Sequence, residues 1–264
     1  MIVAPLFFQT RDAIKNHFQN PFFKQIQYLC SKFRKMEIQN LSYLLLLLIY
    51  LVIPVALSFQ KKVRFVFRLK YILPAVIFAG AIFVMWDLRF IQMKIWTFNP
   101  DYFTGIELLR LPIEEWLAFL IIPLSSIYIY EWLKIRFEDF DKPNVFVIIS
   151  LVLLLATGVL AYIFRTRMFS FFTFFLSAIY LGYTVFRNRF KKYYTKFYLA
   201  LAISLIPFLI VSALLNSLPA IVYDSAHTMG LALFGVPVEK IGYLFLLLLI
   251  NITIYEYLSN RKQQ

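Results

Sequence analysis

Cysteine and histidine are almost missing from this sequence, which contains one cysteine, Cys30, and two histidines, His17 and His227. A single thiol excludes a disulfide framework, and so few imidazole and thiol groups argue against a His/Cys metal site. The seven glycines are too scattered to form a G-x-G-x-x-G motif, so no dinucleotide site is predicted. We expect neither a metal nor any other cofactor.

Charged residues are also scarce. They make up 16% of the 264 residues, whereas 61% are hydrophobic, a balance that the surface of a soluble domain could not tolerate. The net charge of +13 comes from short basic clusters between apolar runs, which is a topology signal rather than a nucleic-acid-binding patch. The sequence therefore predicts an all-α integral membrane protein that lies in a lipid bilayer and binds no nucleic acid.

Seven apolar segments follow a basic N-terminal extension, residues 1–40, which suits either a surface-bound amphipathic helix or a disordered tail. Each segment has roughly the 20 residues that a helix needs to cross the hydrocarbon. We predict seven transmembrane helices at Leu41–Phe59, Tyr71–Leu88, Pro112–Leu133, Val145–Phe164, Met168–Phe186, Phe197–Leu218 and Pro237–Leu258.

The chain contains an internal duplication. Residues 105–133 match residues 230–258 at an offset of 125 residues, with ten of 29 positions identical. The matches include a glycine, a Pro-x-Glu unit and a Tyr-Glu pair. The same offset places the first three predicted helices on the last three. We therefore expect two parallel three-helix repeats, 41–134 and 166–264, joined by a linker helix in 135–165, with the site between the repeats.

The loops predict an orientation. Basic residues gather between the first and second helices, between the third and fourth, and between the fifth and sixth, which places these loops and the C-terminus in the cytoplasm of a cell-membrane protein. The basic extension then falls on the opposite side, against the same rule. Translation from Met36, or binding of the extension to the outer surface, would reconcile the two.

Acidic residues gather at the opposite, exoplasmic end. Pro-x-Glu alone is an ordinary helix start, because proline needs no partner at the first position and a carboxylate suits the positive end of the dipole. Its recurrence near apolar depth, where ionisable groups are costly, indicates function for Glu114 and Glu239. Glu115 and Asp87 are further candidates, with pairing to Arg89 as the alternative for Asp87. Glu131 and Glu256 lie among aromatic residues that suggest an interface belt.

Several motifs resemble those of the lycopene cyclase domain of bacteria, archaea and fungi, here with two subunits fused in one chain. They are WD at 86–87, W-x-FNPDYF at 96–103, LPIEEWLAF at 111–119, VYD at 222–224 and VPVEK at 236–240. The resemblance covers about residues 41–260. One departure is Lys240, because the family usually has a second acid after the glutamate in both repeats.

The resemblance implies an isomerase, an intramolecular lyase that cyclises the acyclic ends of lycopene to β-ionone rings. Such a reaction needs a carboxylic acid kept neutral by burial, a second group to accept a proton, and aromatic faces for a carbocation. We expect Glu114 as the acid, with Glu239 ionised beside Lys240. The expected substrate-binding residues are Trp86, Trp96, Trp116, Phe119, Asn99, Tyr223 and Asp224.

Other interpretations stay open at this level. The enzyme could form another ring type or act on a longer carotenoid, and further partners, such as other carotenoid-pathway enzymes or a second copy of the chain, are undetermined. A transporter is the alternative from another class, since parallel repeats also occur in sugar-transporter folds. Transport needs access from both faces, whereas these carboxylates cluster at one end.

Overall fold

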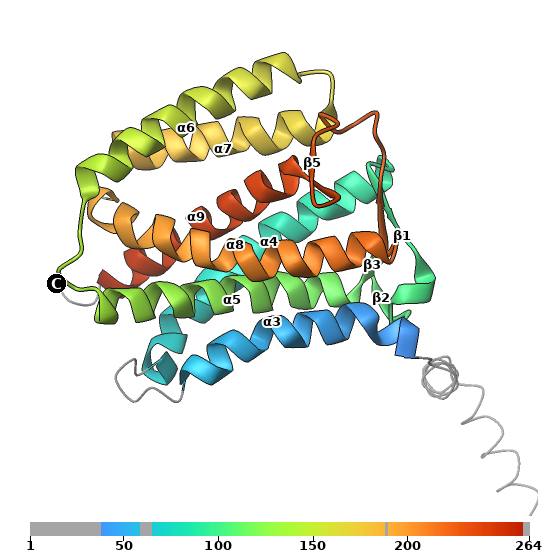
Figure 1. Ribbon diagram of the computed structural model, residues 1–264, viewed down its shortest axis with the longest axis horizontal. Coiled ribbons are helices and arrows are strands. Elements are labelled where there is room, and N and C mark those ends of the chain that lie inside the picture. Colours follow the sequence, from blue (N-terminus) through green and yellow to red (C-terminus); the bar gives the residue numbers. More distant parts are fainter. Residues whose placement is uncertain (1–37, 59–64, 188–189, 261–264) are drawn as a thin grey trace, which may run out of the picture.

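A computed structural model describes residues 38–58, 65–187 and 190–260, so the predicted N-terminal extension lies largely outside the described residues. These ranges contain seven α-helices arranged as one bundle (Figure 1). They are α3 (Ser42–Ser58), α4 (Phe65–Gln92), α5 (Ile113–Arg136), α6 (Pro143–Ile163), α7 (Met168–Phe186), α8 (Tyr194–Ser217) and α9 (Val238–Asn260), with short 3-10 turns at Ile38–Leu41, Pro100–Tyr102 and Lys191–Tyr193.

Six of these helices, α4 to α9, are long and apolar enough to cross a membrane. Much of their surface is apolar and exposed. On α6, for example, Ile148, Val152 and Leu155 are more than half exposed, which would be unfavourable in water and suits contact with lipid. The protein is therefore an all-α membrane-embedded protein. The helix α3 is apolar but shorter.

The second predicted span differs most from the structure. The apolar run predicts a span over residues 71–88, whereas α4 extends from Phe65 to Gln92. Hydropathy detects only the apolar part of a helix that lies in the hydrocarbon. The helix itself continues through the flanking polar residues until its backbone N–H and C=O groups form hydrogen bonds elsewhere. Asp87 consequently lies within α4 and not at its end.

Short strands join the helices at one end of the bundle, at the right in Figure 1, and periodicity did not predict them. The strands β1 (Trp96–Phe98) and β4 (Ile221–Tyr223) pair antiparallel with each other. Each repeat also has a small hairpin before its last helix. These hairpins are β2 (Glu107–Leu108) with β3 (Leu111–Pro112), and β5 (Ala232–Leu233) with β6 (Val236–Pro237).

The strand pairing shows how the repeats are related. The register of β1 and β4 centres on Thr97 opposite Val222, which are equivalent positions 125 residues apart. Backbone bonds on either side are equivalent as well: Asn99 N–H donates to Ala220 O at 2.9 Å, and Asp224 N–H donates to Ile95 O at 2.9 Å. Such reciprocal contacts indicate an approximate two-fold axis through this end of the molecule.

Helix packing follows the same symmetry. The last helix of each repeat contacts the second helix of the other, α5 against α8 and α9 against α4. Within each repeat, the first helix packs on the last, α3 on α5 and α7 on α9, while α6 covers α7 at one edge of the bundle (Figure 1). The repeats are thus interleaved, and their shared interface contains the axis.

At the other end of α5 and α9 the Tyr-Glu pairs are buried, not arranged as an interface belt. Lys134 Nζ lies 3.1 Å from Glu131 Oε1 and 2.7 Å from Glu256 Oε1, so it joins the two equivalent carboxylates. Arg68 binds Glu131 as well, and the Tyr130 hydroxyl donates to Glu256 at 2.7 Å. This group of ion pairs connects the repeats far from the strands.

Candidate active site

A cavity opens between the repeats near the strand end of the bundle. It is lined by residues of α3, α4, α5, α8, α9, β4 and β6, among them the three charged side chains Asp87, Glu115 and Lys240. Its volume of about 60 Å³ is several times the ~10 to 15 Å³ that one water molecule needs. Equivalent positions of both repeats line it, including Glu115 with Lys240 and Asp87 with Ser212, so it surrounds the approximate two-fold axis.

The two carboxyl groups of the cavity are deeply buried, and each accepts a hydrogen bond from a tyrosine hydroxyl group. Asp87 is 3% exposed and Glu115 is 5% exposed. The Tyr43 hydroxyl donates to Glu115 Oε1 at 2.9 Å, and the Tyr243 hydroxyl donates to Asp87. Because buried carboxyl groups have lost water as a partner, these bonds hold both groups in place without pairing either with a cation.

Lys240 supplies a positive charge to the same cavity. Its Nζ lies 5.7 Å from the ring centroids of Trp96 and Tyr223, a geometry that suits cation-π contact. Lys240 lines this cavity together with both carboxyl groups. Loss of hydration raises the pKa of the Tyr223 phenol, although the charge of Lys240 opposes this shift. The phenol therefore stays neutral, and its oxygen can accept a hydrogen bond from the ammonium group of Lys240.

The charged side chains of the cavity are two carboxyl groups and one ammonium group. A like charge nearby disfavours ionisation of a carboxyl group, and an opposite charge favours it. One ammonium group can compensate only one carboxylate, so the charges of this cavity favour one neutral and one ionised carboxyl group.

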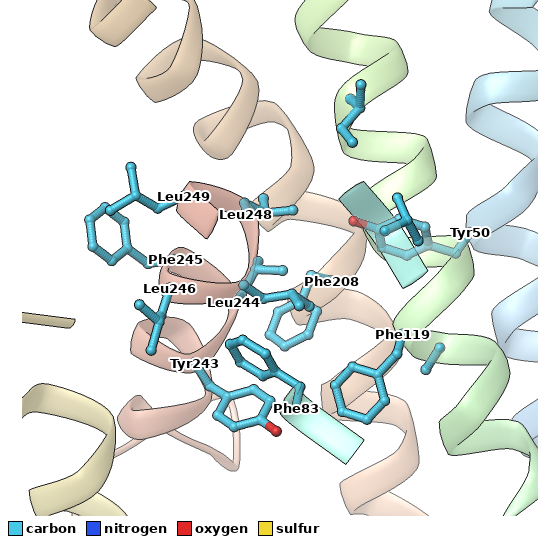
Figure 2. Close-up of a cluster of buried hydrophobic side chains, with 14 of the residues drawn as sticks. Tyr50, Phe83, Phe119, Phe208, Tyr243, Leu244, Phe245, Leu246, Leu248 and Leu249 are labelled. Atoms are coloured by element: carbon cyan, nitrogen blue, oxygen red, sulfur yellow. The ribbon is translucent and has the colours of Figure 1, made fainter. Parts of the chain in front are cut away.

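Aromatic rings form one wall of the cavity. Phe119 and Tyr243 line the cavity, and Phe83 packs against both rings. Figure 2 shows the three rings converging from three helices; the ring centroids of Phe83 and Tyr243 are 4.7 Å apart and those of Phe119 and Tyr243 are 6.4 Å apart. Trp86 packs behind Tyr243 at 5.4 Å. Such faces can stabilise a cation by roughly 0.5 to 2 kcal/mol each.

The two Pro-x-Glu glutamates lie outside the lining of this cavity. Glu114 Oε1 accepts the backbone N–H of Thr104 at 2.7 Å, and Glu239 Oε1 accepts the backbone N–H of Met229 at 2.5 Å. Both side chains are fully buried, and both bonds reach ten residues back along the chain. The duplicated motif therefore ties each loop to the first turn of the helix that follows it.

A duplicated glycine is part of each of these loop anchors. Gly105 and Gly230 follow the residues that donate these bonds, and their φ angles are 72° and 83°. Glycine adopts such a conformation without the steric cost that other residues meet. The strongest matches between the repeats, glycine and Pro-x-Glu, thus share a local backbone requirement.

Several residues that we predicted to bind substrate have local roles at this end. The side chains of Asn99 and Asp224 accept the backbone N–H two residues on, from Asp101 at 3.2 Å and from Ala226 at 2.9 Å. The Trp116 indole donates to Leu108 O of the hairpin at 3.3 Å. Of the predicted set, the structure brings Asp87, Glu115, Phe119 and Tyr223 to the cavity, with Trp96 beside Lys240 and Trp86 behind Tyr243.

Several polar residues of the cavity, among them Tyr43, Lys240 and Tyr243, are absent from the predicted set of site residues. Tyr43 and Tyr243 gave no signal, because tyrosine in an apolar helix resembles the other aromatic residues around it. Lys240 did give one: it occupies the position equivalent to Glu115, so any site that surrounds the axis must contain both. At the level of sequence, the charge of Lys240 is considered only for its effect on Glu239, the preceding residue, although successive helical residues point about 100° apart.

These features define a membrane protein of two interleaved repeats with a buried acidic and aromatic cavity on the axis between them. The family model for lycopene cyclase matches residues 40–133 and 166–258, one match for each repeat and together well over half of the chain. The protein belongs to the lycopene cyclase family, which confirms the resemblance and supports a lycopene cyclase activity. Comparison with curated proteins and with solved structures gives no match.

Proposed function

We propose that the protein is a lycopene β-cyclase and that the cavity between the repeats is its active site. The family supports a carotenoid substrate and a lipid environment. The observation that carries the proposal is the pair of buried carboxyl groups, Asp87 and Glu115, facing one aromatic cavity. A two-sided transporter is disfavoured, because the charges of the cavity lie near one end of the bundle.

The reaction begins with proton transfer from a neutral carboxyl group to the terminal carbon–carbon double bond of the substrate. We assign this group to Asp87, which shares the cavity with the carboxyl group of Glu115, since a like charge nearby favours the protonated form. Protonation leaves a tertiary carbocation. The π electrons of the next double bond in the chain then attack it, one carbon–carbon bond forms, the ring closes, and a second tertiary carbocation results.

A base must finally remove a proton next to this second carbocation. We assign this role to Glu115, which accepts a hydrogen bond from the Tyr43 hydroxyl group and shares the cavity with the ammonium group of Lys240. Loss of the ring proton places the new double bond in conjugation with the polyene, which makes the β ring the more stable product. The proton then returns to Asp87. No atom is gained or lost, so the enzyme is an isomerase that consumes no cofactor.

The aromatic wall contributes in two ways. Phe119 and Tyr243 present their rings to the carbocations, and together with Phe83, which packs against them, they keep water from capturing these intermediates. In this assignment Glu114 and Glu239, the acids expected from the sequence, hold the loops that precede α5 and α9. That Glu114 itself is the acid stays a prediction, and the same experiment tests it.

Expression in a lycopene-producing bacterium tests the proposal. We expect the wild-type chain to convert lycopene to a carotene with β rings, seen by pigment chromatography, and Glu115→Gln to lose at least about 100-fold of this conversion, as expected for a general base. Glu138→Gln, a change of the same chemistry at an exposed position, is the matched control. Unchanged lycopene with wild-type protein present in the membrane would contradict the function.

We further propose that the protein spans the cell membrane seven times, with α3 as the first span and the strand end facing outward. The basic loops support this orientation. A reporter fused after Lys192 should be cytoplasmic and one inserted at Ser225 should be exoplasmic. Finding both on one side would disprove the arrangement.

A further inference from the structure

Lys240 occupies the one position where the two halves of the cavity carry opposite charges. Its equivalent is Glu115, and the equivalent of Asp87 is Ser212; all four line the cavity. The first repeat therefore supplies both carboxyl groups, and the second repeat supplies an ammonium and a hydroxyl group. In a symmetric cavity four carboxyl groups, or two lysines, would face one another around the axis.

We propose that Lys240 is a positioning residue that makes the active site one-sided: it compensates one negative charge, so that the cavity is neutral when one of its two carboxyl groups is protonated and the other is ionised. This inference rests on the proposed function. It concerns the division of labour between the acids, which the family assignment leaves undefined.

Charge counting supports this role. With both carboxyl groups ionised and Lys240 charged, the cavity would carry a net charge of −1 in surroundings where an uncompensated charge is costly. One bound proton brings it to zero. The neutral state of the cavity is thus also its reactive state, with one acid and one base. Without Lys240, neutrality would require both carboxyl groups to be protonated, and no base would be present.

The geometry fits a distant counter-charge and not a direct ion pair. Among the described residues no salt bridge joins Lys240 to either acid, although all three side chains line one cavity, and Lys240 Nζ lies over the rings of Trp96 and Tyr223. The carboxyl groups instead bond the hydroxyl groups of Tyr43 and Tyr243. Lys240 can therefore set the charge of the cavity and leave both carboxyl groups accessible to the substrate.

A set of charge variants tests this proposal, each measured as lycopene conversion per amount of protein in the membrane. We expect Lys240→Met to lower conversion at least about tenfold, because a buried negative charge loses its compensation, and Lys240→Arg to retain more activity than Lys240→Met. Lys192→Met, at an exposed position, is the matched control.

The decisive variant exchanges the equivalent residues across the axis. Glu115→Lys and Lys240→Glu should each lower conversion strongly, since the cavity then contains two lysines and one acid, or three acids and no lysine. The double variant restores the original composition and should be more active than either single variant.

The outcomes distinguish the role of Lys240 from the cyclase function. Near-normal conversion by Lys240→Met, or a double variant no more active than Glu115→Lys, would overturn the role of Lys240 and leave the cyclase function intact. A wild-type chain that converts no lycopene would overturn the function itself.

Discussion

The two repeats begin their last helices with the same Pro-x-Glu unit and then diverge at the next residue. Glu114 and Glu239 make the same bond to a backbone N–H ten residues upstream. Glu115 and Lys240, one position later, have opposite charges and meet in the same cavity. Duplication has kept the residue that each copy needs for its own loop. The residue that faces the axis could change, because there the two copies share one site.

Under the proposed assignment, repetition in the sequence marks the loop anchors, and the chemistry lies where the repeats differ. A loop anchor is needed twice, once for each loop, so both copies retain it. An acid and a base are needed once for the whole molecule. Sites on an axis between unequal repeats are therefore expected where equivalent residues differ, as Asp87 differs from Ser212 and Glu115 from Lys240.

The largest effect should come from the acid that only the first repeat supplies. Asp87→Asn keeps the shape and the bond from Tyr243 but cannot deliver a proton, so we expect conversion of lycopene to fall by at least about 100-fold with unchanged protein in the membrane. Asp141→Asn in the exposed loop before α6 is the control. Near-normal conversion by Asp87→Asn would place the acid elsewhere.

The equivalent anchors should give smaller and similar effects. Glu114→Gln and Glu239→Gln each weaken a buried hydrogen bond to a loop N–H, which we expect to lower the free energy of unfolding by about 1 to 3 kcal/mol and to reduce conversion only as far as stability falls. Thermal unfolding in detergent and pigment chromatography measure the two quantities.

The same two variants also test whether Glu114 is the acid. If Glu114→Gln abolished conversion without lowering stability, while Glu239→Gln and Glu115→Gln remained active, Glu114 would be the acid that the Pro-x-Glu motif suggested. The loop anchor would then be only part of its role.

The smallest effect on activity should arise at the opposite end of the bundle, where the repeats are alike. Lys134→Met removes the cation between Glu131 and Glu256, but Lys134 is 30% exposed, so solvent compensates part of the loss. We expect a lower unfolding temperature and less than about a tenfold change in conversion per folded protein. A larger loss of activity at unchanged stability would show that this end takes part in catalysis.

The sequence by itself determined the local properties of this protein. Apolar runs fixed the positions of the helices, since each run must match the thickness of the bilayer, and the shared offset of 125 residues predicted a duplication. The clustering of Asp87, Glu114, Glu115 and Glu239 towards one end followed from their places along the helices. These features depend on neighbours in the chain, so a pattern in one dimension can reveal them.

Only the tertiary structure decided which of these groups share a cavity. The rotation of α5 turns Glu115 towards the axis and Glu114 towards its own loop, a difference of about 100° that packing fixes and hydropathy does not. The pairing of β1 with β4 and the interleaving of α5 with α8 and α9 with α4 then bring Lys240 opposite residues more than 100 positions away. Charge compensation inside a membrane depends on such distances in space, and therefore the tertiary structure determined the site.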